Sequence, residues 1–115
     1  MSQLRSAGVE KEQQRLLRHV VLFRWKEGTP AEKVGEIERT FCELPSKIEQ
    51  IHTFEWGTDV SVEGKSKGMS HCFLVTFASA EDRDIYLPHP AHEAFSTLAK
   101  PHVADVLVLD YWGEA

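Results

Sequence analysis

The sequence predicts an α+β protein of the ferredoxin-like class, β-α-β-β-α-β, with one four-stranded antiparallel sheet. Four segments rich in β-branched and aromatic residues are typical of strands, and two amphipathic helical regions lie between them. Their order along the chain is strand, helix, strand, strand, helix, strand, which is the split βαβ pattern. A length of 115 residues suits one such domain, expected at residues 17–113 after a polar arm at residues 1–16.

The four strands are expected at residues 19–25, 53–57, 71–77 and 106–112. Successive side chains of a strand point to opposite faces of the sheet. One face then collects His19, Val21, Phe23, Trp25, His71, Phe73, Val75, Phe77, Val106, Val108 and Asp110. The opposite face collects Val20, Leu22, Leu74, Leu107, Leu109 and Tyr111. Both faces are therefore largely apolar.

The first helical region follows the first strand. Thr29 and Glu32 predict a capping box, with Pro30 at the first helical position. An apolar stripe with spacings of three and four residues follows, made of Val34, Ile37, Phe41 and Leu44. Pro45 predicts that the helix ends or kinks at Leu44, because a residue before proline disfavours the helical conformation.

The second helical region is expected to consist of two helices. Ser79, followed by acidic residues, predicts an N-cap. Pro88 breaks the region, Pro90 is expected at the first position of the next helix, and His89 is expected to cap it. His92 and Phe95 lie three residues apart, so they share one face of that helix.

The apolar character of both sheet faces predicts the assembly state. Two helical regions can cover only one face of a four-stranded sheet. A large exposed apolar patch usually marks an interface. We therefore expect a second copy of the chain to cover the exposed face, sheet against sheet, in a two-fold homodimer.

Composition weighs against several partners and compartments. A formal net charge of −5 disfavours nucleic acid or an anionic membrane as partner. No apolar run approaches the roughly 20 residues that span a bilayer, and the polar N-terminus does not resemble a signal peptide. Cys42 and Cys72 are expected as buried, reduced thiols of a cytoplasmic protein. We find no phosphate-binding glycine loop, metal-ligand spacing or nucleophile elbow, so neither a metal nor a cofactor is expected.

The stretch from Tyr86 to Phe95 holds the residues with the greatest chemical potential. The unperturbed pKa of histidine, about 6.5, suits a general base at His92, and a buried Tyr86 hydroxyl can donate to a developing oxyanion. A purely structural role is equally open, since His92 can satisfy a carbonyl freed by Pro88 or Pro90. Ligand binding without chemistry is the third interpretation.

A pocket between helices and sheet is expected beside Tyr86 and His92. Its apolar lining is expected from Val21, Phe23, Ile37, Phe41, Phe73, Phe95 and Val108. His19 and Asp110 should meet at one end of the sheet, where a hydrogen bond would orient the imidazole or simply pair two buried polar groups. His71 opens a strand that runs antiparallel to the first, about 20 Å from His19, which argues against a zinc site with His92.

Several motifs together resemble the stress-responsive dimeric α+β barrel (Dabb) family over residues 17–112. They are His19-Val-Val-Leu-Phe-Arg-Trp25, Trp56-Gly-Thr-Asp59, His71-Cys-Phe-Leu-Val-Thr-Phe77, His89-Pro-Ala-His92 and Val108-Leu-Asp-Tyr111. The family implies a ferredoxin-like fold whose two sheets form a barrel across a homodimer. Polyketide cyclases of the olivetolic acid cyclase type belong to it, and they close a linear polyketide thioester by aldol condensation. This resemblance implies a general base at His92, a polarising hydroxyl at Tyr86, and supporting pocket histidines at His19 and His71.

Two hypotheses therefore stand. The first is a homodimeric, cyclase-like enzyme that abstracts a proton next to a carbonyl of a β-keto or polyketide-like substrate. The second is a stress-associated protein without catalysis, either structural or ligand-binding. A closed core without a cavity beside His92 and Tyr86 would exclude the enzyme.

Overall fold

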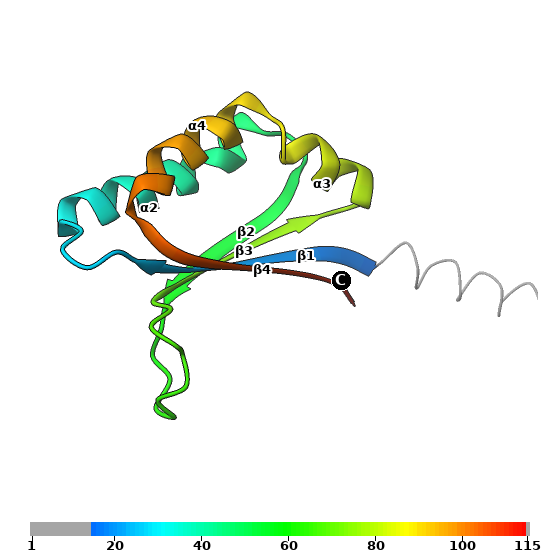
Figure 1. The fold of residues 1–115 in the computed structure, drawn as a ribbon. Helices are drawn as coiled ribbons and strands as arrows, with labels where there is room; N and C mark the ends of the chain where they lie inside the picture. Colours follow the sequence, from blue (N-terminus) through cyan, green and yellow to red (C-terminus); the bar gives the residue numbers. More distant parts are fainter. Residues whose placement is uncertain (1–14, 115) are drawn as a thin grey trace, which may run out of the picture.

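The computed structural model describes residues 15–114, which form a four-stranded antiparallel sheet with three α-helices over one face (Figure 1). The elements are β1 (Arg15–Trp25), α2 (Ala31–Lys47), β2 (Ile51–Thr58), β3 (His71–Phe77), α3 (Ala80–Tyr86), α4 (Pro90–Ala99), the 3₁₀ turn η1 (Lys100–His102) and β4 (Val103–Glu114). The strand order β2-β3-β1-β4 confirms the predicted ferredoxin-like class. Most of the predicted arm lies outside the described residues, while Arg15 and Leu16 belong to β1.

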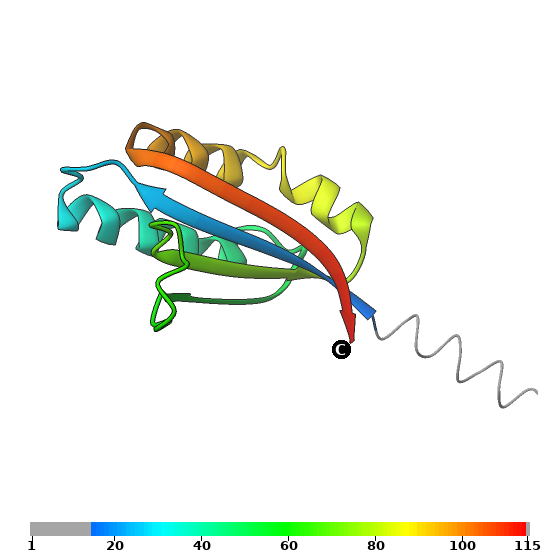
Figure 2. The same cartoon turned by 60° about the horizontal axis from the view of Figure 1, so that its bottom comes forward.

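The register of the central strands confirms the predicted division into two faces. In β1, His19 lies opposite Val75 of β3 on one side and Asp110 of β4 on the other. β4 is a long, curved edge strand that runs beside β1 over nearly its full length (Figure 2). The end of the sheet that carries His19 and Asp110 is therefore built from two adjacent antiparallel strands.

Aromatic packing holds the helices onto the sheet. Phe41 of α2 stacks on Phe73 of β3 with ring centroids 4.1 Å apart, and Phe95 of α4 meets Phe41 edge-on at 4.6 Å. All three rings are almost completely buried. Burying a side chain of this size stabilises the fold by roughly 1.5–3 kcal/mol. The core that positions the candidate site is thus the layer between the sheet and α2 and α4.

The α2 helix begins differently from the prediction. Pro30 is the N-cap residue in an extended conformation, and no side chain of the described residues caps the helix. The Thr29 hydroxyl donates instead to the Lys26 carbonyl at 2.7 Å, because Gly28, with φ at 82°, turns the chain back over Lys26. The predicted capping box between Thr29 and Glu32 is therefore wrong.

The α2 helix also ends later than predicted. It continues through Pro45 to Lys47, and the Ile48 N–H closes it by donating to the Leu44 carbonyl at 2.9 Å. A proline in the last turn removes a single helical hydrogen bond, and helix ends tolerate unpaired groups that water can reach. Of the two outcomes predicted at Leu44, an end or a kink, the end is wrong for this reason.

The two caps predicted in the second helical region are confirmed. The Ser79 hydroxyl accepts from the Asp82 N–H at 3.1 Å at the start of α3. His89 caps α4, where its Nδ1 accepts from the Ala91 N–H at 3.0 Å and Pro90 is the first helical residue. The break between α3 and α4 therefore has a local cause in the sequence.

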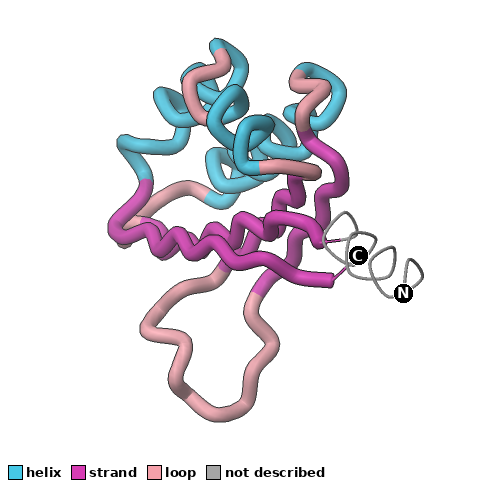
Figure 3. The backbone as a smooth tube through the Cα atoms, turned by 90° about the vertical axis from the view of Figure 1, so that its right-hand side faces the viewer, coloured by secondary structure: helices cyan, strands magenta, loops and turns pink. Residues whose placement is uncertain are grey.

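The sheet face opposite the helices is apolar, and no helix among residues 15–114 covers it. We call it the open face, and it consists of Val20, Leu22, Leu74, Leu107, Leu109 and Tyr111. Leu109 is 58% exposed and Leu107 is 46% exposed. The loop at residues 59–70 projects from this same side of the sheet (Figures 1 and 3).

The two cysteines differ in their surroundings. Both are free thiols, Cys72 is partly buried, and Cys42 is exposed. The expectation of burial was wrong for Cys42, because it follows Phe41 around α2 and points away from the apolar stripe. Within residues 15–114, no helix is both long and apolar enough to cross a membrane.

Candidate active site

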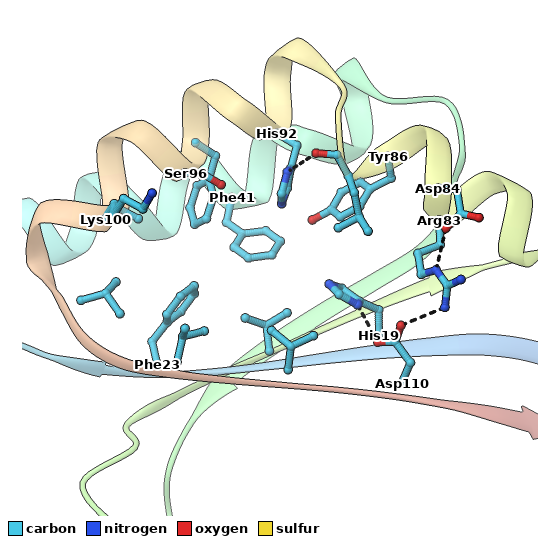
Figure 4. A pocket seen from close by; sticks show the side chains of 17 residues that line it. His19, Phe23, Phe41, Arg83, Asp84, Tyr86, His92, Ser96, Lys100 and Asp110 are labelled. Atoms are coloured by element: carbon cyan, nitrogen blue, oxygen red, sulfur yellow. Dashed lines mark hydrogen bonds and ion pairs between the residues drawn. The ribbon is translucent and has the colours of Figure 1, made fainter.

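A cavity of about 510 Å³ lies between the sheet and helices α3 and α4 (Figure 4). Strands β1 and β4 form its floor, α4 its roof and α3 one end. Nine predicted residues line it: His19, Val21, Phe23, Phe41, Tyr86, His92, Phe95, Val108 and Asp110. Its size falls within the range of small-molecule sites, and its walls are mostly apolar.

Three residues predicted for the pocket do not line it. Ile37 and Phe73 are completely buried in the core and do not contact the cavity. His71 lies four register positions from His19 along β1 and β3, because it pairs with Phe23. Sharing a sheet face with His19 did not bring His71 into the same cavity.

Tyr86 ends α3 with its ring completely buried between Phe77 and His92. Its hydroxyl is the one buried side-chain polar atom without a hydrogen-bond partner among residues 15–114. Burial raises the pKa of Tyr86 far above its usual value, so the hydroxyl keeps its proton. An unsatisfied buried hydroxyl costs about 1–3 kcal/mol. Because no described residue accepts its proton, the Tyr86 hydroxyl is available to donate to a ligand in the cavity.

His92 points from α4 into the same space (Figure 4). Its Nδ1 lies 2.9 Å from the Leu87 carbonyl oxygen, which can only accept, so Nδ1 carries the proton. Nε2 of the neutral ring is therefore bare. Burial lowers the pKa of His92, against the smaller opposing effect of the Leu87 hydrogen bond, and this favours the neutral, basic form. The structural role at Nδ1 thus leaves a base at Nε2.

His19 is oriented by a carboxylate that it shares with an arginine. Its Nδ1 lies 2.7 Å from Asp110 Oδ1, which confirms the predicted hydrogen bond. Arg83 donates through a guanidinium nitrogen to Asp110 Oδ2 at 3.1 Å, and through Nε to Asp84 at 3.1 Å. These two carboxylates raise the pKa of Arg83, so its charge persists. An ionised Asp110 can only accept, so His19 Nδ1 carries a proton, and in the neutral imidazole the second ring nitrogen is then bare.

Three side chains from three elements therefore converge at one end of the cavity. The ring centroids of Tyr86 and His92 are 4.6 Å apart, and those of Tyr86 and His19 are 5.9 Å apart. Figure 4 shows both imidazoles and the phenol directed into the same space. The arrangement combines the bare Nε2 of His92 with one hydroxyl donor and with a second imidazole that Asp110 orients. It can remove a proton from a ligand and donate a hydrogen bond to the oxygen on which negative charge develops.

His71 belongs to a separate polar cluster. Its Nε2 lies 2.6 Å from Glu38 Oε2, and its Nδ1 lies 3.1 Å from Trp25 Nε1 and 2.9 Å from Ser70 Oγ. An indole N–H can only donate, so Nδ1 is the acceptor and Nε2 carries the proton. Both ring nitrogens are therefore occupied within the protein. No group of three or more potential metal ligands occurs in the described part of the chain.

We expect His71→Leu to lower stability without affecting the cavity. The change leaves the Trp25 N–H and the Glu38 carboxylate without their partner, and each unsatisfied group costs about 1–3 kcal/mol if it stays buried. Urea unfolding should show the loss, while ligand affinity of the folded variant stays at the wild-type level. If His71→Leu lowers ligand affinity while the free energy of unfolding stays unchanged, His71 is part of the binding site.

Several lining residues were not predicted from the sequence. They are Arg83, Asp84, Leu87, Ser96, Ala99, Lys100, Val103 and Val106. One signal was available for part of this set, because Ser96 and Lys100 follow His92 at intervals of four residues on a helix. Nothing in the local sequence marks Arg83, whose partner Asp110 is distant in the chain.

Known proteins resemble this chain over nearly all of its described length. It is 39% identical over 95 residues to the stress-response A/B barrel domain-containing protein HS1 of Arabidopsis thaliana, a match that covers 83% of this chain and 87% of that protein. It is 28% identical over 95 residues to olivetolic acid cyclase of Cannabis sativa, which covers 83% and 94% of the two chains.

Solved structures show the same fold. A crystal structure of an Arabidopsis thaliana protein with 37% identity superposes with a TM-score of 0.80, over 86% of this chain and 96% of the other. A hydroxynitrile lyase from Passiflora edulis, at 24% identity, gives a TM-score of 0.82 over 88% and 95% of the two chains. The stress responsive A/B barrel domain family matches residues 17–113. The chain belongs to this family.

Proposed function

We propose that the cavity is a catalytic site in which His92 removes a proton next to a carbonyl of a β-keto or polyketide-like substrate. The observation that carries the proposal is the buried Tyr86 hydroxyl, which has no hydrogen-bond partner within residues 15–114 and faces a cavity of about 510 Å³ beside the bare Nε2 of His92. Similarity to olivetolic acid cyclase supports an aldol-type cyclisation as the reaction class.

The side chains divide the reaction among them. His92 Nε2 takes the proton from the carbon next to the carbonyl, and the Tyr86 hydroxyl donates a hydrogen bond to the resulting enolate oxygen. The enolate carbon then attacks a second carbonyl of the same chain and forms the new carbon–carbon bond. The alkoxide produced at that carbonyl takes back the proton from the His92 imidazolium. His19, held by Asp110, provides a second acceptor for the substrate.

We expect the reaction to depend on His92 in a defined pH range. Burial places the pKa of His92 below its usual value of 6.5, so activity should rise as pH increases through that lower value. His92→Asn keeps an N–H that can donate to the Leu87 carbonyl but removes the base, and should lower kcat by about 10²–10⁴-fold. His52→Asn changes an exposed histidine of β2 and serves as the matched control.

The experiment screens β-ketoacyl thioesters and aromatic acids by thermal shift and by turnover, with wild type, His92→Asn and His52→Asn. Ligands should stabilise wild type and the His52 variant more than the His92 variant. Equal stabilisation of all three proteins would remove His92 from the site. Stabilisation without turnover in wild type would support the second hypothesis, a ligand-binding protein without catalysis.

The same burial of His92 links protonation to folding. The unfolded chain binds the proton more tightly than the folded protein, so this contribution to stability is complete above about pH 6.5 and declines as pH falls through the lower folded pKa. The wild type should therefore lose more stability on acidification than His92→Asn.

We also propose that two copies associate through the open face. The apolar area exposed by β4 on this face supports it, because a monomer would leave that area in water. Dimeric proteins of the same fold are among the structural neighbours. The cavity lies on the opposite side of the sheet, so each copy would carry its own site.

A further inference from the structure

A polar stripe runs along the roof of the cavity. His92, Ser96 and Lys100 succeed one another at intervals of four residues, and all three line the cavity from α4 and its C-terminal end (Figure 4). At 1.5 Å per residue, the stripe extends about 12 Å from the proposed base to the lysine. Between these polar groups, Phe95 and Ala99 complete the same helix face with apolar contacts.

Charge is distributed unequally between the two ends of the cavity. At the His19 end, Arg83 is matched by Asp84 and Asp110 at 3.1 Å each. At the other end, Lys100 forms no ion pair within residues 15–114. Of the two cationic side chains that line the cavity, Arg83 is paired with carboxylates, whereas Lys100 is paired with none within the described residues.

The region between the two ends is apolar and open along β4. Phe23, Val106 and Val108 form this part of the floor. Val106 is 47% exposed and Val108 is 55% exposed, although both face the side of the sheet that carries the helices. A ligand can therefore lie lengthwise against the β4 floor, with its chain on the valines and a polar group at each end.

We propose that Lys100 anchors a substrate carboxylate, and that the site is built for an apolar keto acid. Its carbonyl would lie at Tyr86 and His92, its chain on the floor, and its carboxylate at the Lys100 ammonium, with Ser96 available to an oxygen between them. This inference rests on the proposed function and adds the substrate class. A single carboxylate suits the site better than a polyphosphate carrier, because one lysine faces the ligand and the protein carries a net charge of −5.

The test uses a medium-chain fatty acid with a ketone near its far end, and the primary amide of the same acid as a neutral ligand of similar shape. Isothermal titration compares wild type, Lys100→Met, Lys100→Arg and the control Lys47→Met on the outer side of α2. Lys100 is exposed and water screens its charge, so the acid should bind about two- to fivefold more tightly than the amide to wild type. Lys100→Met should abolish that preference, while Lys100→Arg and Lys47→Met keep it.

The outcomes separate this inference from the proposed function. If Lys100→Met keeps the preference for the acid, Lys100 is not the anchor. If acid and amide bind equally to wild type and Tyr86→Phe weakens the binding of both, the cavity beside Tyr86 is the binding site. The proposal that Lys100 anchors a carboxylate is then overturned. If neither ligand binds to wild type, the keto-acid assignment is overturned, and the proposed function is then decided by the thioesters alone. Loss of the preference in high salt would support the ionic contact.

Discussion

Replacing Tyr86 with phenylalanine is expected to stabilise the ligand-free protein and to abolish most of its activity. The hydroxyl is buried without a partner among the described residues, so its removal relieves a cost of about 1–3 kcal/mol while the ring keeps its contacts with Phe77 and His92. The same hydroxyl is the proposed donor to the enolate oxygen, and loss of one such donor typically lowers kcat by about 10²–10³-fold. Urea unfolding and turnover on the same preparation measure the two effects.

The opposite signs of these effects make the prediction specific. A tyrosine that serves only the fold should lose stability, or stay unchanged, when it is truncated. Tyr111→Phe provides the control at protein concentrations low enough to keep the chain monomeric, because the Tyr111 side chain is 47% exposed in the single chain. If Tyr86→Phe unfolds more easily than wild type, the hydroxyl has a structural partner and the central observation of the proposed function fails.

The sequence predicted the parts of the site that depend on strand parity and strand order. His19 and Asp110 were expected to meet because alternation puts both on one face and the ferredoxin-like order makes their strands antiparallel neighbours; the 2.7 Å contact confirms it. The break between α3 and α4 was also expected from local sequence. Pro88 and Pro90 have no backbone N–H, so neither can donate the hydrogen bond that would continue a helix.

The alternation of side chains along a strand predicts the face on which a residue lies. It does not predict which residues of that face line the same cavity. His71 and His19 face the same side, yet His71 pairs with Phe23, four residues along β1 from His19. Trp25 and Glu38 also occupy both nitrogens of His71. Arg83 was not predicted from the sequence, because its contact with Asp110 depends on how α3 packs over the sheet. That placement is set by tertiary packing, which no local pattern records.

Introducing a charge at the centre of the open face is expected to separate the proposed homodimer. Leu109 lies between Leu107 and Tyr111 on β4 and is 58% exposed in the monomer, so Leu109→Glu should leave the single chain folded. In a two-fold interface the change occurs twice, and an unpaired buried charge costs about 3 kcal/mol or more at each position. The two costs together amount to about 6 kcal/mol or more, so the dissociation constant should rise at least about ten-thousandfold, which sedimentation velocity over a concentration series detects.

Ile85→Glu is the matched control, because Ile85 is an apolar residue of α3 with 47% exposure on the helix side of the molecule. It should sediment as wild type does.

The distribution of polar groups supports the open face as the interface. Arg18 donates to Thr76 and to the Glu114 carbonyl at the margin of this face, so the polar contacts surround an apolar centre. A folded Leu109→Glu variant that still dimerises at the wild-type concentration would place the interface elsewhere. A wild type that sediments as a monomer at all concentrations would mean that the open face serves another partner, because an apolar surface of this extent is seldom left in water.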